Sequence, residues 1–256
     1  MNNSVPQFKL LNPEWPAPPQ VKTAVTTREG GISQGPYQSL NLGDHVGDDP
    51  KCVLENRALL GKFLPNEPIW LKQVHGVKVS TPNARLDEAD AIVTNKPNEV
   101  LAIMTADCLP VLFTSESGDV IGAAHAGWRG LCNGVLENTV KEMQVLSGAS
   151  SAKNMLAWLG PAIGPTAFEV GADVLEAYQD AKIPFPEQSF VAIPGKPGKY
   201  LANLYLLARS RLESVGLHQI YCGDYCTVNQ DEQFFSYRRD GVTGRFASLI
   251  WISQSK

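Results

Sequence analysis

Residues 120–146 read VIGAAHAGWRGLCNGVLENTVKEMQVL, and their pattern changes from strand to helix at the glycine-rich turn around Gly127. Residues 120–125 form a short apolar run that is typical of a buried strand. Apolar residues then recur at helical spacing over residues 128–146, and Gly148 stands where the helix would stop. A strand that leads directly into an amphipathic helix indicates an α/β fold.

The flanking sequence continues this alternation of short apolar runs, helical patterns and turn residues. Strands are predicted at residues 21–27, 69–72, 77–80, 89–94, 100–105, 110–114, 155–159, 190–193 and 219–221, and helices at residues 50–65, 171–181 and 201–215. Residues 116–119 are predicted to form a hairpin turn around Gly118, and residues 234–238 and 245–252 a terminal hairpin. Antiparallel pairs next to helices predict a mixed α/β sheet covered by helices.

Composition limits the class of protein. The 256 residues are 43% apolar, and no linker, charge run or repeat divides them, so we predict one domain over residues 1–256. The formal net charge is −4 without a Lys/Arg cluster, which favours small-molecule partners over nucleic acid. No run reaches the roughly 20 apolar residues of a membrane span, residues 1–15 lack the pattern of a leader, and the five cysteines are odd in number. We therefore expect a cytoplasmic protein with no membrane partner, whose cysteines are thiols or ligands rather than disulfides.

Two of the four histidines and one cysteine stand at predicted ends of strands. His75 follows one strand, His125 ends another, and Cys108 lies between two. Imidazole and thiolate groups suit zinc, and three protein ligands leave a tetrahedral position open, as in catalytic rather than structural zinc sites. The spacing matches no compact zinc finger, so the three residues are also compatible with a buried core. Another alternative is a Cys108 nucleophile with His125 as its base.

Arginines next to glycines are candidate contacts for an anion. Arg129 opens a predicted helix, where free backbone amides and the helix dipole favour negative charge. Arg28 begins a long loop predicted over residues 28–48, and Arg238 and Arg239 lie near the predicted terminal hairpin. Surface arginines are common, so a solvated side chain is the alternative at each position.

Seven motifs in order resemble the family described variously as multicopper polyphenol oxidase, laccase-domain protein, purine nucleoside phosphorylase and peptidoglycan editing factor. They are TTR with GG (residues 26–28 and 30–31), SLNLG (39–43), KQVHG (72–76), TADCLP (105–110), HAGWRG (125–130), GPAIG (160–164) and FFSYRRD (234–240). The resemblance implies an α/β fold similar to the deamidase domain of the cytotoxic necrotizing toxins. It also implies zinc, with copper as a possible substitute, on His75, Cys108 and His125.

The activities implied by this resemblance are phosphorolysis of adenosine, inosine, guanosine and methylthioadenosine, and hydrolytic deamination of adenosine. For deamination, the acid beside the cysteine, Asp107, is our candidate for proton transfer. For phosphorolysis, Arg28 and Arg129 are our candidate phosphate contacts. Asn41 and Gln73, in the matched motifs, are further candidate contacts to substrate.

Three other functions stay open. The resemblance also suggests hydrolysis of serine or glycine from a UDP-muramyl precursor, which the same metal chemistry would serve. A copper-dependent polyphenol oxidase fits one of the family's names, but only His45 and His218 remain for a further copper cluster. In a non-enzymatic alternative the zinc only stabilises a binding protein, and the open coordination position argues against this.

Overall fold

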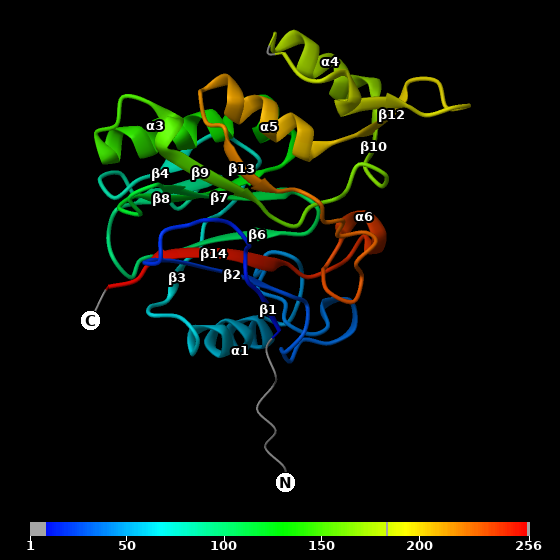
Figure 1. Ribbon diagram of the computed structural model, residues 1–256. Coiled ribbons are helices and arrows are strands. Elements are labelled where there is room, and N and C mark those ends of the chain that lie inside the picture. Colours follow the sequence, from blue (N-terminus) through cyan, green and yellow to red (C-terminus); the bar gives the residue numbers. More distant parts are fainter. Residues whose placement is uncertain (1–8, 183, 255–256) are drawn as a thin grey trace.

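The computed structural model describes residues 9–182 and 184–254, and its elements form four layers (Figure 1). Helices α3 (Val135–Ser147) and α5 (Leu204–Ser214) cover one face of a six-stranded sheet, whose other face packs on a five-stranded sheet. Helix α1 (Pro50–Gly61) covers the outer face of the five-stranded sheet. Residues 1–8 of the segment predicted to lack a leader lie outside the described residues.

The six-stranded sheet carries the strand pair that matters most for the site. Its order is β13 (Gln219–Cys222), β9 (Met155–Leu159), β7 (Leu109–Ser115), β8 (Ile121–Ala126), β5 (Ala91–Thr94) and β4 (Val79–Ser80). The outer pairs are parallel and the inner pairs antiparallel. The predicted hairpin around Gly118 is confirmed, since β7 pairs antiparallel with β8. Pro110 therefore lies opposite His125, at the end of the sheet where the hairpin is open.

The last strand along the chain is the central strand of the five-stranded sheet. Its order is β1 (Leu10–Leu11), β2 (Val21–Thr26), β14 (Phe246–Ile252), β6 (Val100–Thr105) and β3 (Pro68–Ile69). A third sheet of β10 (Glu169–Gly171), β12 (Lys199–Ala202) and β11 (Phe190–Ala192) lies beside α4 (Ala172–Asp180), at the upper right of Figure 1. Short 3-10 turns occur at Gly35–Tyr37, Ala152–Asn154 and Glu187–Ser189.

The alternation of side chains along each strand explains how one strand contributes to the cores on both faces of its sheet. In β6, Leu101 and Ile103 face the core between the two sheets, whereas Ala102 and Met104 face the core beneath α1. Successive side chains of a strand point to opposite faces, so a strand covered on both faces reads as a continuous apolar run. All six residues of β6 are buried, which is why the sequence predicts this strand with its bounds intact.

The prediction of a mixed α/β fold is confirmed, with two differences. The strands form two large sheets packed on each other and a small third one, rather than a single sheet. The predicted helix at residues 128–146 is divided into α2 (Trp128–Cys132) and α3 at Gly134, whose φ of 96° lies in the left-handed region that glycine adopts without strain. The likeness to toxin deamidase domains stays a prediction.

The predicted terminal hairpin is wrong. Residues 237–240 form the short helix α6 (Tyr237–Asp240), and the Ser236 hydroxyl caps it by accepting a hydrogen bond from the Arg239 amide at 3.2 Å. Strand β14 pairs with β2 and β6 instead. Phe234 and Phe235 are fully buried against the core between the sheets, so this apolar run is an anchored loop and not a strand. Among the described residues, no helix is both long and apolar enough to span a bilayer.

Candidate metal centre

The structure brings His75, Cys108 and His125 together. Cys108 directly precedes β7, His125 lies in β8, and His75 lies in the loop between β3 and β4. The ligand atoms of the three side chains all lie within 4.8 Å of one another, and Cys108 Sγ lies 3.6 Å from His75 Nε2. Tetrahedral zinc would separate sulfur and nitrogen ligands by about 3.5 Å. The three residues thus fit a metal ion.

Two residues with unusual backbone conformations shape this site. His75 has a φ of 62° and Asp107 a φ of 93°, both in the left-handed region that residues other than glycine rarely adopt. Asp107 lies where the chain leaves β6 in one sheet and enters β7 in the other. Such strain concentrates at functional sites, because the surrounding structure must hold it in place. Here it delivers Cys108 and His75 to the same point.

A buried carboxylate, Asp90, connects the ligands and was missed in the sequence analysis. It is fully buried and accepts hydrogen bonds from His125 Nδ1 at 2.8 Å and from the amides of His75 at 2.8 Å and Gly76 at 2.7 Å. The carboxylate can only accept while ionised, so His125 Nδ1 carries the proton and Nε2 remains available to a metal. The signal in the sequence was an acid within the apolar run from Ala89 to Val93.

Electrostatics favour an ionised cysteine. Burial alone would raise the pKa of Cys108 and is the largest single effect, but the charge and hydrogen bonds of His125, together with His75, outweigh it and lower the pKa to about 6. Burial opposes the charged form of His125, yet the thiolate and Asp90 raise its pKa to about 9. Burial also opposes the charge on Asp90, but hydrogen bonds from His125 and Gly76 keep its pKa below the usual range. Without metal, the site therefore favours a thiolate–imidazolium pair, whose proton a metal ion would replace.

The glycines of the HAGWRG motif allow the backbone to approach the ligands. A Cβ atom at Gly127 would lie 2.6 Å from His75 Cδ2 and 3.2 Å from Cys108 Sγ. A Cβ atom at Gly130 would lie 2.8 Å from the carbonyl oxygen of Gly76. Any larger residue at these positions would displace the ligands or the loop that carries them.

A cavity of about 590 Å³ opens over the three ligands. Its wall combines aromatic side chains with guanidinium groups: Arg129 stacks on Trp128 at 4.2 Å and Arg238 on Phe168 at 5.3 Å. The other lining residues are His45, Gln73, Met104, Thr105, Ala106, Asp107, Ile163, Tyr237 and Arg245. Among the described residues, no carboxylate pairs with Arg129, Arg238 or Arg245. The wall is therefore cationic as well as aromatic.

The other predicted site residues divide into two groups. Asp107, Gln73 and Arg129 line the cavity. The carboxylate of Asp107 accepts hydrogen bonds from the Thr227 hydroxyl and the Arg238 amide, both at 2.6 Å. The Gln73 side chain donates to the carbonyl oxygen of Met104 at 2.8 Å and accepts from its amide at 2.9 Å.

Arg28 and Asn41 do not line the cavity. The Arg28 guanidinium donates to the carbonyl oxygens of Gln38 at 3.1 Å and Asp231 at 3.0 Å, so it ties two loops together. Asn41 is fully buried, and its side-chain oxygen accepts from the amides of Gly43 at 2.9 Å and Arg245 at 2.8 Å. Both residues support the loops near the site.

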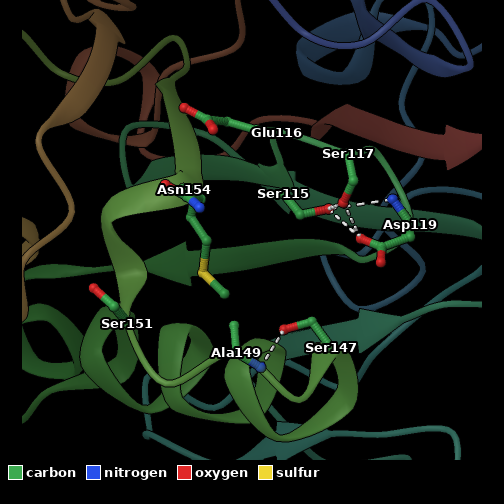
Figure 2. Close-up of a pocket in the computed structure, with 9 residues that line it drawn as sticks. Ser115, Glu116, Ser117, Asp119, Ser147, Ala149, Ser151 and Asn154 are labelled. Atoms are coloured by element: carbon green, nitrogen blue, oxygen red, sulfur yellow. Dashed lines mark hydrogen bonds between the residues drawn. The ribbon is translucent and has the colours of Figure 1, made fainter.

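A second cavity, of about 310 Å³, lies at the opposite end of β7 from Cys108. Figure 2 shows its hydroxyl-rich wall, where the side chains of Ser115 and Ser117 converge on Asp119. The two hydroxyls donate to the Asp119 carboxylate at 2.5 Å and 2.6 Å. These groups satisfy one another within the hairpin turn, and the described residues that line this cavity include neither an arginine nor any of the three candidate metal ligands.

Residues 22–253 match the model of the family described as multi-copper polyphenol oxidoreductase laccase. The chain belongs to this family. The chain is similar to the purine nucleoside phosphorylase of Haemophilus influenzae, which is 51% identical over 253 residues that cover 96% of this chain and 100% of that protein. The purine nucleoside phosphorylase YfiH of Escherichia coli is 51% identical over 251 residues, covering 95% of this chain and 99% of that protein.

Two solved structures share the fold of this chain. A Neisseria meningitidis protein is 48% identical with a TM-score of 0.87, and the match covers 96% of this chain and 99% of that one. YlmD from Geobacillus stearothermophilus is 30% identical with a TM-score of 0.85, and the match covers 98% of this chain and 99% of that one. The fold is thus the one found in these two proteins.

The laccase name suggests several copper ions, but the described residues form a single His/Cys group suited to a metal. His45, on the cavity wall, is exposed and contacts Asp44 at 3.3 Å. His218 follows α5 and is exposed. In this member of the laccase family, the described histidines therefore provide one metal position and no cluster.

Proposed function

We propose that this protein is a metal-dependent purine nucleoside phosphorylase that carries zinc on His75, Cys108 and His125. One observation carries the proposal most directly: aromatic rings share one cavity wall over the candidate metal ligands with guanidinium groups that have no carboxylate partner among the described residues. A purine offers a flat apolar face to aromatic rings, and phosphate is an anion that guanidinium groups bind well. The names of the two bacterial phosphorylases support the same function.

The size and chemistry of the cavity suit this pair of substrates. At about 590 Å³ it lies within the usual range of small-molecule sites. In phosphorolysis, a phosphate oxygen forms a bond to ribose C1′ while the bond from C1′ to the purine nitrogen breaks. The electron pair of that bond goes to the purine, and one proton moves from phosphate to the base. The products are ribose 1-phosphate and a free purine.

The residues of the chain have separate parts in this chemistry. A zinc ion held by His75, Cys108 and His125 would supply Lewis-acid catalysis. Asp90 holds the proton on His125 Nδ1 and fixes the direction of the ring. Trp128 and Phe168 exclude water from the purine face, and Arg129 and Arg238, stacked on these rings, add positive charge to the wall of the cavity that receives the phosphate.

We propose adenosine deamination as a second activity of the same site, with Asp107 as the carboxylate that transfers protons. Asp107 borders the cavity, although its two oxygens already accept hydrogen bonds from Thr227 and Arg238. Proton transfer would require one of these bonds to open. If an Asp107→Asn protein deaminates adenosine at the wild-type rate, Asp107 does not transfer the proton and has only a structural role in the cavity wall.

The test is a substrate panel with zinc-loaded protein. Adenosine, inosine, guanosine and methylthioadenosine are each supplied with phosphate, and release of base and ribose 1-phosphate is followed by chromatography. Parallel arms contain adenosine without phosphate, UDP-muramyl-serine, UDP-muramyl-glycine and a phenolic substrate with copper-loaded protein. We expect nucleoside turnover that disappears in His75→Ala. Turnover of a muramyl precursor or a phenol without nucleoside turnover would replace the proposal, and no turnover at all would favour a metal-stabilised binding protein.

A further inference from the structure

The end of the five-stranded sheet faces the same cavity as the metal ligands. Thr105 is the last residue of β6 and lies opposite Phe246, the first residue of β14. Arg245 directly precedes β14, and both Thr105 and Arg245 line the cavity. His125 lies in β8 of the six-stranded sheet, and Cys108 directly precedes β7 of the same sheet. The cavity thus has two candidate metal ligands from the end of one sheet, and a hydroxyl and a guanidinium from the end of the other.

The hydroxyl of Thr105 has no partner in the protein. The residue is 2% exposed, and its Oγ1 makes no hydrogen bond to any other part of the chain that the structure describes. A buried polar group without a partner costs free energy, and in native proteins it usually has a ligand or water to bond. Since Thr105 lines the cavity, the missing partner is expected there.

The guanidinium of Arg245 uses only part of its hydrogen-bonding capacity within the protein. Its Nη1 donates to the carbonyl oxygens of Thr243 at 3.2 Å and Gly244 at 3.0 Å, which leaves Nε and Nη2 without an acceptor among the described residues. Its stem packs so closely on Gly43 that a Cβ atom there would lie 2.8 Å from Arg245 Cγ. Asn41 fixes the backbone of Arg245 through its amide.

Arg245 remains a cation suited to an oxyanion. Burial, the largest effect, lowers the pKa of Arg245, while the negative charges of Cys108 and Asp107 oppose the shift. An arginine stays protonated throughout the physiological range, and its planar fork matches two oxygens of a phosphate or carboxylate. Arg28, predicted from sequence to contact phosphate, donates hydrogen bonds to carbonyl oxygens of two loops and does not line the cavity.

We propose that Arg245 and Thr105 form an oxyanion subsite that binds the phosphate co-substrate in the cavity that the candidate metal ligands also line. The proposal deepens the proposed phosphorylase function and rests on it. Phosphate oxygens accept from Nε and Nη2 of Arg245 and from Oγ1 of Thr105. Asn41 is a positioning residue for this subsite, because its side chain accepts a hydrogen bond from the amide of Arg245. Gly43 leaves room for the stem of Arg245, so two residues of the SLNLG motif support the subsite.

Phosphorolysis and deamination at one site provide the test, because only the first consumes phosphate. The variants are Arg245→Gln, Arg245→Lys and Thr105→Val, which keeps the shape of the side chain. The control is Arg85→Gln, whose arginine pairs with Glu99 next to the opposite end of β6. The KM for phosphate is measured with inosine, and kcat/KM for adenosine deamination is measured in phosphate-free buffer. Melting temperatures establish that each variant is folded.

We expect Arg245→Gln to raise the KM for phosphate by about 10- to 100-fold, the usual effect of losing charge-assisted hydrogen bonds, while deamination changes less than about threefold. Arg245→Lys should fall between wild type and Arg245→Gln, Thr105→Val should raise the KM severalfold, and Arg85→Gln should match wild type. An unchanged KM for phosphate in folded Arg245→Gln and Thr105→Val proteins, or equal losses of both activities, would overturn the subsite.

Direct binding separates failure of the subsite from failure of the proposed function. Inorganic phosphate is titrated calorimetrically into zinc-loaded wild-type, Arg245→Gln and Arg85→Gln proteins. If wild type binds phosphate and Arg245→Gln does not, the subsite is supported even if inosine is not cleaved, and only the proposed function is wrong. If the wild-type and Arg245→Gln proteins bind phosphate equally, or neither binds it, the subsite is wrong.

Discussion

Replacing Asp90 with asparagine should weaken zinc binding without removing any ligand. The Asp90 carboxylate accepts hydrogen bonds from His125 Nδ1 at 2.8 Å, from the amides of His75 and Gly76 at 2.8 and 2.7 Å, and from Val74 at 3.2 Å. Asparagine keeps one oxygen and places an NH₂ group where the other oxygen stood. At least one of the N–H groups that now donate to Asp90 must then face this NH₂ group, which is itself a donor. The negative charge of the carboxylate is also lost.

The magnitude follows from the bond to His125. If the NH₂ group faces the ring, His125 Nδ1 must become the acceptor and the proton moves to Nε2, the atom that a metal needs. Loss of such an outer partner typically weakens metal binding 10- to 100-fold, which corresponds to about 1.4–2.7 kcal/mol. A charge-assisted hydrogen bond contributes about 1.5–3 kcal/mol, so the two ranges agree.

Zinc affinity is measured by competition with a chromogenic chelator near neutral pH, and the melting temperature is recorded with and without zinc. The matched control is Asp87→Asn, the same chemical change at an exposed position three residues earlier. We expect the control to bind zinc like wild type. A folded Asp90→Asn protein with wild-type zinc affinity would refute the role of Asp90 in orienting His125.

Three further predictions concern the ligands and the core. Gly127→Ala should abolish zinc binding while the chain stays folded, because the added Cβ would lie 2.6 Å from His75 Cδ2; equilibrium dialysis with unchanged zinc binding would contradict this. In zinc-free protein, iodoacetamide should modify Cys108 at pH 7, where the thiolate is present. The reaction of Cys108 should slow as the pH falls below about 6, because the thiolate is then protonated. Cys52, whose pKa is raised, should react only in alkaline solution. Peptide mass mapping checks this order, and preferential labelling of Cys52 at pH 7 would be inconsistent with it. Trp158→Ala should lower the free energy of unfolding by about 3–5 kcal/mol, since Trp158 is 1% exposed and fills the core between the sheets; a loss below about 1 kcal/mol in urea titrations would argue against that packing.

The three candidate ligands could be selected from sequence because histidine and cysteine are residue types that bind metals, and the resemblance to the family favoured this interpretation over a buried core. The structure brings their ligand atoms within 4.8 Å of one another. Asp90 could not be assigned in the same way, since its role depends on β5 pairing with β8, where Ala91 lies opposite Ala124. That long-range register places the Asp90 carboxylate beside His125.

The same limit explains the wrong terminal hairpin and the different surroundings of the candidate arginines. Strand β14 looked like half of a hairpin, but its partners β2 and β6 lie far away in the sequence. Arg28 lies two residues before Gly30, and Arg245 directly follows Gly244. Their contacts differ, because Arg28 donates to the carbonyl oxygens of Gln38 and Asp231, whereas Arg245 keeps Nε and Nη2 without an acceptor among the described residues. Local patterns reveal strands and candidate ligands, whereas pairing partners and hydrogen-bond satisfaction appear only in three dimensions.

Metal content and phosphorolysis measured on the same samples give the most direct test of the proposed enzyme. Zinc per chain is determined by elemental analysis, and ribose 1-phosphate formed from inosine and phosphate is quantified, for wild type and for His75→Ala. We expect about one zinc ion per wild-type chain together with phosphorolysis, and loss of both in His75→Ala. Undiminished phosphorolysis by a metal-free chain, or several copper ions per chain with a strong blue absorption, would contradict a single zinc centre as the site of the reaction.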